Sequence, residues 1–281
     1  MSDKIDVLIP VYNSSEELRR TLKSVSMSRA INKLNIIVVD NDSEDDIRSV
    51  LGQFSFPIHY HKNNFNIGRI PNWNVALKLV SNTRFMFLFA GDELNPHLDF
   101  NKIIDLLSDS NHIVFPFNMK GKKSDSLVNI FGFSTLEHNL ELRLGEFLLG
   151  CKMPWAPLQT HIFNSDSCVN IFEESNYTHA DVEFVFSALS TTKNVSFYPS
   201  PLFTWVWSEK RFHNLIDLHE SVRDDYKFTL QKLRSMSTNF STSRLKLNFI
   251  FKLVRFARNY PFKLVLSLIW MTLILGDDNA K

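Results

Sequence analysis

The chain has 281 residues, which is enough for one large α/β domain with an appendage. Its 31 Lys and Arg are balanced by 30 Asp and Glu, so it lacks the basic excess of a general nucleic-acid binder, and no nucleic-acid partner is expected. The composition is that of a globular protein, with 44% hydrophobic residues, and its 25 Phe are interpreted mainly as core filling, with some apolar surface for a membrane as the alternative. Cys151 and Cys168 show no CxxC spacing, which argues against a structural zinc site or a disulfide framework.

Apolar runs and helical stripes alternate along the first 120 residues. Strands are predicted at 6–12, 34–40, 57–61, 84–90 and 112–119, and helices at 14–25, 44–54, 71–80 and 100–110. Ser14 and Glu17 have the spacing of a capping box, and Pro71 suits the first residue of a helix. Strands that alternate with helices in this way predict a mostly parallel sheet with helices on both faces.

Beyond residue 120 the alternation loosens. A polar loop is expected at 121–126, a helix at 140–150, a loop leading into a strand at 154–164, a helix at 179–190 and an extended segment at 194–207. The pattern beyond His213 is almost wholly helical. The predicted domains are therefore 1–215, with halves at 1–120 and 121–215, and a helical C-terminal region at 216–281.

Polar residues follow four of the predicted strands. They are Tyr12 with Asn13, then 40–43 ("DNDS"), 64–68 ("NFNIG") and 91–93 ("GDE"). Each group alone has an ordinary explanation as a turn or a helix cap. Together they favour a ligand site, because ligands of parallel sheets bind beyond the carboxyl ends of the strands. No G-x-G-x-x-G or GxxxxGK[ST] motif is present, so a dinucleotide site and a P-loop lose their main support.

The ordered motifs "VLIPVYN", "VVDNDS", "NIGRIPNWN" and "FLFAGDE" resemble those of the family 2 glycosyltransferases. The resemblance covers residues 4 to 210 and is greatest to bacterial enzymes that build O-antigen and capsule repeat units. It implies the α/β GT-A fold, a Rossmann-like and mostly parallel central sheet flanked by helices, here with a helical C-terminal extension. It also implies a nucleotide-sugar donor, usually a UDP-sugar, and a divalent cation, Mg²⁺ or Mn²⁺.

The same resemblance implies which residues bind the nucleotide. Tyr12 and Asp40 would face the nucleobase, with Asp40 accepting the imide N–H of uracil. Gly68 would let the backbone approach the ligand closely. The other implied nucleotide-binding positions are Pro10, Asn13, Asp42, Asn66, Asn74 and Arg211.

The resemblance places the metal site at Asp92, with His213 as a second ligand. Relatives commonly carry two or three acids here, whereas Phe89 and Gly91 occupy those positions in this chain and Glu93 follows Asp92. Mg²⁺ can bind through one or two carboxylates together with phosphates and waters, so one acid can suffice. A degenerate, inactive site is the alternative.

An inverting transfer needs a base that removes the proton of the acceptor hydroxyl. Relatives carry it in a Glu-Asp pair at a helix start, where this chain has Ala180 and Asp181. Asp181 is the predicted base and Glu183 the next candidate, with His179 as a neighbour. Asp181 would also serve as an ordinary helix cap. Lys210 could join Arg211 in neutralising phosphate, and three tryptophans could either stack on sugar rings or pack in the core, namely Trp155, Trp205 and Trp207.

The C-terminal region combines basic and apolar helical stretches. Lys252, Arg255 and Arg258 fall within one arc of a helical wheel, and residues 264–275 carry no charge. That run is too short to span a bilayer core of about 30 Å, but the pair suits a protein lying on an anionic leaflet. Packing on the domain or in a homo-oligomer is the alternative.

The N-terminal "MSDKID" leads directly into the first strand without a signal peptide, so a cytoplasmic protein on the inner face of the bacterial plasma membrane is expected. The expected function is an inverting transfer from a UDP-sugar to a polyprenyl-diphosphate-linked oligosaccharide in surface polysaccharide biosynthesis. The main alternative is a non-catalytic nucleotide-binding or assembly subunit. A cytidylyl- or uridylyltransferase is a more distant one, because its glycine- and arginine-rich phosphate loop is missing.

Overall fold

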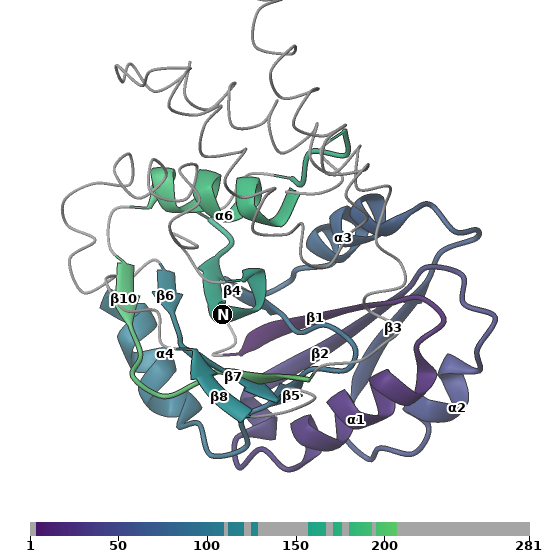
Figure 1. Ribbon diagram of the computed structural model, residues 1–281, viewed down its shortest axis with the longest axis horizontal. Coiled ribbons are helices and arrows are strands. Elements are labelled where there is room, and N and C mark those ends of the chain that lie inside the picture. Colours follow the sequence, from purple (N-terminus) through teal and green to yellow (C-terminus); the bar gives the residue numbers. More distant parts are fainter. Residues whose placement is uncertain are drawn as a thin grey trace, which may run out of the picture. The chain divides into compact units, whose positions relative to one another are not determined.

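A computed structural model of the chain (Figure 1) describes residues 4–109, 112–120, 125–128, 157–166, 171–175, 180–192 and 195–206. All of these belong to the first of two compact units, which comprises Met1–Leu136, Trp155–Ser175 and Ala180–Glu209. The predicted helix at 140–150 and the region 216–281 lie outside the described residues. Within the described ranges, no helix has the length and apolar character needed to cross a bilayer.

A seven-stranded sheet forms the centre of the described unit. Its strand order is β10-β6-β9-β4-β1-β2-β3. The bounds are β1 Ile5–Val11, β2 Leu34–Asp40, β3 Ile58–Lys62, β4 Arg84–Phe87, β6 His112–Val114, β9 His161–Asn164 and β10 Val195–Phe197. Strands β1 to β4 are parallel where they pair, and β10 pairs parallel to β6, whereas β9 runs antiparallel to both β4 and β6. The predicted mostly parallel α/β sheet is confirmed.

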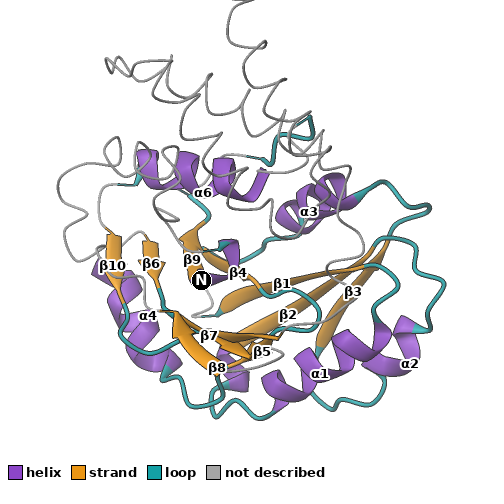
Figure 2. Cartoon of the chain, viewed as in Figure 1, coloured by secondary structure: helices purple, strands orange, loops and turns teal. Residues whose placement is uncertain are grey.

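Helices cover both faces of this sheet (Figure 2). One face packs against α1 (Ser15–Ser26), α2 (Ile47–Leu51) and α4 (Phe100–Asp109) through a mainly aliphatic cluster that includes Leu22, Val50 and Ile103. The other face packs against α3 (Arg69–Lys78) and α6 (Ala180–Thr191) through aromatic rings. Phenylalanines fill both layers, since the first cluster also contains Phe100 and Phe115, as expected for core filling.

A second, four-stranded sheet has the order β5-β11-β7-β8. Its bounds are β5 Glu93–Leu94, β7 Phe117–Lys120, β8 Asp125–Val128 and β11 Phe203–Val206. The prediction of one strand at 112–119 is wrong, because the chain leaves the large sheet after Val114 and enters the small one at Phe117. Pro116 lies between them and has no N–H for a sheet ladder. Strand β5 was not predicted, and β8 begins inside the segment predicted as a polar loop.

The starts of two helices differ from the predictions. α3 begins at Arg69, so Pro71 is its third residue rather than its first. The proline is tolerated there because first-turn N–H groups have no partner within a helix. The predicted capping box is absent, since the Ser14 hydroxyl donates to the Tyr12 carbonyl at 2.7 Å. The distant Asp45 carboxylate instead accepts the Ser15 N–H at 2.9 Å.

At the amino ends of the strands, one buried carboxylate joins several segments by hydrogen bonds. Asp6 is wholly buried and accepts the backbone N–H of Ser81 at 2.6 Å and that of Asn82 at 2.8 Å. It also accepts the Asn35 amide at 2.7 Å. These bonds tie β1 to β2 and to the connection between α3 and β4, at the end of the sheet opposite the candidate site.

Candidate functional site at the carboxyl edge of the sheet

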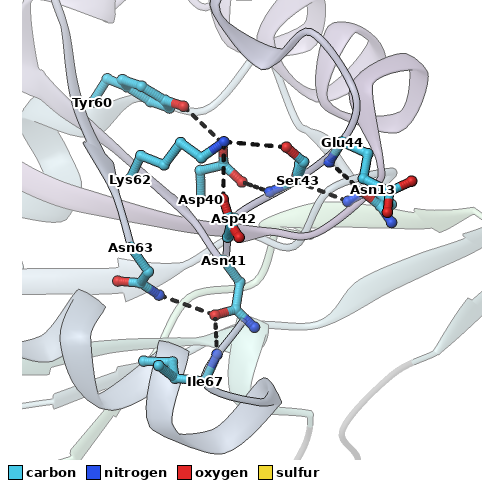
Figure 3. A network of polar contacts seen from close by, with 10 residues as sticks. All are labelled: Asn13, Asp40, Asn41, Asp42, Ser43, Glu44, Tyr60, Lys62, Asn63 and Ile67. Atoms are coloured by element: carbon cyan, nitrogen blue, oxygen red, sulfur yellow. Dashed lines mark hydrogen bonds and ion pairs between the residues drawn. The ribbon is translucent and has the colours of Figure 1, made fainter. Parts of the chain in front are cut away.

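The carboxyl ends of three adjacent strands lie in register. Val11 of β1 pairs with Asp40 of β2, and Asp40 pairs with Lys62 of β3. The ladder continues one residue further, because Asn41 N donates to the Val11 carbonyl and Asn63 N donates to the Asp40 carbonyl, each at 2.9 Å. The segments that follow these strands therefore start side by side, as the sequence predicted (Figure 3).

The segments after β1 and β2 are joined by side-chain bonds. Asn13 and Asp42 have φ values of 47° and 62°, in the left-handed region that Asn and Asp tolerate better than most residues. Asn13 N donates to Ser43 Oγ at 2.9 Å, and Glu44 N donates to Asn13 Oδ1 at 2.8 Å. The two turns thus hold each other at the sheet edge. Tyr12 is left 46% exposed beside them, which gives an aromatic face open to a ligand.

Asp40 lies beneath this pair of turns. Its side chain is only 1% exposed, and both carboxylate oxygens have partners. Oδ1 accepts the Ser43 N–H at 2.8 Å, and Oδ2 accepts the Tyr60 hydroxyl at 2.7 Å. Burial, reinforced by the bond to Asp40, raises the pKa of Tyr60, so the hydroxyl stays protonated and acts as the donor.

The edge strand β3 contributes two side chains that the sequence analysis did not single out. Tyr60 and Lys62 are two residues apart and therefore share one face of the strand. Lys62 Nζ donates to the Ser43 carbonyl at 3.2 Å and pairs with Asp42 Oδ1 at 3.1 Å. The Arg48 guanidinium lies over the Tyr60 ring at 4.7 Å from its centre. The 40–43 turn is thus held from two sides, by β1 and by β3.

A third residue that the sequence did not single out, Asn41, organises the loop at 63–68. It is 3% exposed. Its amide nitrogen donates to Asn66 Oδ1 at 2.7 Å and to the Gly68 carbonyl at 3.2 Å, and its oxygen accepts Asn63 Nδ2 and Ile67 N, each at 3.0 Å. This uses both donors and both acceptor sites of the amide. The sequence signal was the Asn-rich composition of "DNDS" and "NNFNIG", but only the fold shows which asparagine is central.

Gly68 immediately precedes helix α3, as its N-cap, in a conformation that favours glycine. Its φ is 92°, and a Cβ placed there would meet only Pro71 Cδ at 3.8 Å. The backbone conformation, rather than lack of space, therefore calls for glycine. Asn72 in the first turn of α3 accepts Asn63 Nδ2 at 2.9 Å and donates to the Val39 carbonyl at 3.3 Å, which fixes this helix start to β2.

Asn74 serves a different part of the fold. It is buried, donates to the Phe172 carbonyl and to Glu174 Oε1 at 3.0 Å each, and accepts Phe172 N at 2.8 Å. Next to it, Trp73 stacks on Phe89 with ring centres 5.0 Å apart. Asn74 thus anchors the 171–175 segment to α3, and its nucleotide role stays a prediction.

Asp92 lies in a tight turn between β4 and β5. It is wholly buried, and Oδ2 accepts Gln159 Nε2 at 3.1 Å. Thr21 Oγ1 donates to the Asp92 carbonyl at 2.8 Å and accepts Gly91 N at 2.9 Å, where Gly91 has a φ of 96°. Across the described ranges, no three His, Cys, Asp or Glu residues gather closely enough to hold a metal ion.

Helix α6 carries both candidate bases in its first turn. It begins at Ala180, in agreement with the sequence, and Asp181 and Glu183 are partly buried. Trp205 lies on β11 and packs against the aliphatic cluster, in agreement with its core interpretation. The other predicted residues lie outside the described part of the chain, namely Arg211, His213, Lys210, His179, Trp155 and Trp207.

Comparison with known proteins connects this edge to a family. Residues 6–145 match the sequence model of glycosyl transferase family 2. The chain is 36% identical over 77 residues to the uncharacterized glycosyltransferase YfnE of Bacillus subtilis, and 29% identical over 94 residues to the abequosyltransferase RfbV of Salmonella typhimurium. These matches cover 27% and 32% of this chain but only 20% and 28% of the two relatives.

Solved structures agree on the fold. TarS 1–349 of S. aureus in complex with UDP-GlcNAc has a TM-score of 0.66 at 13% identity, covering 97% of this chain and 80% of that one. The mannosyltransferase PcManGT of Pyrobaculum calidifontis, in complex with GDP-Man and Mn²⁺, has a TM-score of 0.55 at 12% identity with the same coverage. The fold is GT-A, and residues 6–145 of the chain carry a glycosyltransferase family 2 domain.

Proposed function

We propose that this chain is an inverting glycosyltransferase that moves a sugar from a UDP-sugar to a lipid-linked glycan in surface polysaccharide biosynthesis. The observation that carries the proposal is the carboxyl edge of β1, β2 and β3, where three strand ends in register present two interlocked turns and an exposed Tyr12. This edge lies within the stretch that matches the family. The abequosyltransferase among the relatives supports sugar transfer as the chemistry.

The nucleotide is assigned to this edge. Tyr12 offers its ring to the nucleobase, and Asp40 offers a carboxylate for the imide N–H of uracil. The neighbours were solved with UDP-GlcNAc, UDP and GDP-Man, so the fold accommodates more than one base. UDP is chosen here because the motif resemblance implies a UDP-sugar, and a carboxylate suits the imide N–H of uracil. Asn13, Asp42 and Asn66 shape the surrounding turns.

The acidic turn can supply only part of the ligand shell of a divalent cation. Asp92 is buried, and a single carboxylate suits Mg²⁺ or Mn²⁺ only when phosphate oxygens and waters complete the shell. Glu93 follows directly, and the mannosyltransferase neighbour was solved with Mn²⁺. When bound, such a cation stabilises the negative charge that develops on the leaving diphosphate. His213 completes this proposal as a second ligand.

The base is assigned to Asp181 in the first turn of α6. Its carboxylate takes the proton of the acceptor hydroxyl while that oxygen bonds to the anomeric carbon and the bond from this carbon to the UDP oxygen breaks. Attack from the face opposite the leaving group inverts the anomeric configuration. Arg211 is placed at the diphosphate, whose charge increases in this step.

The proposed lipid-linked acceptor and the proposed membrane location are based on the sequence of the C-terminal region. Its basic arc and uncharged run suit the surface of an anionic leaflet, where a polyprenyl-diphosphate-linked oligosaccharide would be held. The protein is accordingly proposed to be cytoplasmic and peripheral on the inner face of the bacterial plasma membrane. In the proposed domain division, the catalytic part ends at residue 215 and this region follows it.

Turnover with a panel of UDP-sugars tests the proposal. Full-length protein with Mg²⁺ or Mn²⁺ and a membrane extract as acceptor source should release UDP from one donor, and Asp92→Asn should lower that rate by orders of magnitude. Asp99→Asn on the surface before α4 is the control. If UDP binds but no donor is consumed with any acceptor source, the non-catalytic alternative is supported, and "FAGDE" with Ala180 would explain it.

A further inference from the structure

The Tyr60 hydroxyl occupies the Asp40 oxygen that the proposed donor nucleotide would use. Its oxygen lies 2.7 Å from Asp40 Oδ2, while Ser43 N holds Oδ1 at 2.8 Å (Figure 3). Asp40 is only 1% exposed, so an imide N–H has no free route to either oxygen while Tyr60 stays in place. A nucleobase that is read by Asp40 must therefore replace one of these two donors.

Tyr60 is the donor that can leave. The Ser43 N–H belongs to a turn that Asn13 and Lys62 also hold, so releasing it would break several bonds at once. Tyr60 is partly exposed and lies on β3, at the edge of the seven-stranded sheet. Moving its hydroxyl breaks one hydrogen bond, and water can satisfy the freed hydroxyl at the surface.

We propose that Tyr60 gates Asp40: its hydroxyl caps Asp40 Oδ2 in the nucleotide-free protein, and a uracil imide N–H displaces it when the donor binds. This inference rests on the proposed function, because it assumes a nucleotide at this edge. Tyr60 is then a positioning residue that sets both affinity and base selectivity. Uracil carries a proton on N3 and can take over the bond, whereas cytosine carries a lone pair there and would face the carboxylate unfavourably.

The neighbours of Tyr60 fit such a gate. The Arg48 guanidinium over its ring and the bond to Asp40 stabilise the capped arrangement. The bond is also directional, since the hydroxyl remains protonated and donates to the carboxylate. A capped Asp40 avoids leaving a buried charged oxygen without a partner, which is costly. The bond from Tyr60 to Asp40 thus stabilises the nucleotide-free site, and it competes with the nucleobase for the same carboxylate oxygen.

Calorimetric titration of the full-length chain with UDP and CDP tests the gate. Tyr60→Phe removes the hydroxyl and keeps the ring, so UDP should bind about 10- to 150-fold more tightly, the range expected for one competing hydrogen bond to a charged group. CDP affinity should change little, so the preference for UDP over CDP should rise. Tyr198→Phe, at the β10 side of the sheet, is the matched control and should alter neither affinity.

Asp40→Asn provides an independent variant. The amide oxygen should remain on the Ser43 N–H, which places the amide nitrogen, a donor, where Oδ2 was. UDP should then bind less tightly and CDP relatively more tightly, because cytosine N3 accepts. The gate would be overturned if Tyr60→Phe bound UDP no more tightly than the wild type and kept the wild-type ratio of UDP affinity to CDP affinity. If wild-type protein binds neither nucleotide, the proposed function itself fails.

Discussion

Asn41 illustrates how one residue can control a site that it need not touch. Its amide is saturated by four hydrogen bonds that connect the end of β2 to the 63–68 loop. The sequence marked "DNDS" as a turn at the right place, but it could not rank its members. The ranking depends on the pairing of β2 with β1 and β3, which is a tertiary property.

Asn41→Asp should weaken UDP binding by about 5- to 150-fold, equivalent to about 1–3 kcal/mol. The substitution is nearly isosteric, but it replaces two N–H donors with an acceptor that faces the Asn66 and Gly68 oxygens. Calorimetric titration with UDP measures the effect. Asn101→Asp on the exposed side of α4 carries the same charge change as a control, and equal affinities in the two variants would exclude a positioning role for Asn41.

Asp181→Asn tests the assigned base. Asparagine keeps the size of the side chain but is a poor proton acceptor, so turnover should fall by about 10²- to 10⁴-fold. UDP affinity should stay near that of the wild type, because Asp181 lies on α6 and not at the β1–β3 edge. Glu183→Gln in the same turn serves as the comparison, and a larger loss of turnover there would reassign the base to Glu183.

At the scale of elements, the sequence predicted most strands and helices because apolar periodicity determines them. The 34–40 strand agrees residue for residue, and the helix predicted at 100–110 spans Phe100–Asp109. The failures involve partners that are distant in sequence. The 112–119 run divides between two sheets, and β5 exists because Leu94 and Glu93 pair with β11, more than a hundred residues away.

The pairing of β6 with β9 buries two histidines against each other. His112 Nε2 lies 2.7 Å from His161 Nδ1, and both side chains are almost completely buried beside Phe163. Burial, together with the neighbouring His161, holds the pKa of His112 well below its ordinary value. The folded protein therefore keeps His112 neutral at pH values where the unfolded chain takes up a proton.

This pair makes stability depend on pH. Stability from neutral His112 is complete above the unfolded pKa of about 6.5, and it is lost as the pH falls from there towards the lower folded pKa. The free energy of unfolding should drop by up to about 1.4 kcal/mol per pH unit between pH 6.5 and 5.5. Denaturant unfolding at several pH values measures this dependence. The free energy of unfolding of His112→Gln should change less with pH than that of the wild type, whereas the exposed His97→Gln should show the wild-type pH dependence.

At the scale of the whole molecule, the two sheets draw strands from both halves of the predicted domain 1–215. β9 and β10 join the sheet of β1–β4, and β5 and β7 join the sheet of β11. The proposed site residues also come from both halves of the predicted domain. The edge proposed to bind the nucleotide is formed by β1, β2 and β3, whereas Asp92 contacts Gln159 and Asp181 lies on α6. The residues of the first group lie together because each follows a strand of the same sheet edge directly.

The proposed membrane binding depends on the basic arc in the C-terminal region and is therefore tested on the full chain. Replacing Lys252, Arg255 and Arg258 together with Gln should reduce binding to anionic vesicles by about 100-fold, since each basic residue contributes about 1 kcal/mol near such a surface. Flotation of full-length protein at low and high salt measures it, because charge attraction is screened by salt. A control with Lys4, Arg20 and Lys102 changed to Gln should float like the wild type, and equal flotation of both variants would refute membrane binding by this arc.

Binding of the uridine part of a nucleotide-sugar at the carboxyl edge of β1, β2 and β3 is the core of the proposed function. Calorimetric titration of the full-length protein with UDP, CDP and GDP, repeated with Asp40→Ala, tests it most directly. UDP should bind best, and Asp40→Ala, while still folded, should lose about 1–3 kcal/mol of UDP binding free energy. Equal UDP affinity in wild type and a folded Asp40→Ala would contradict the claim.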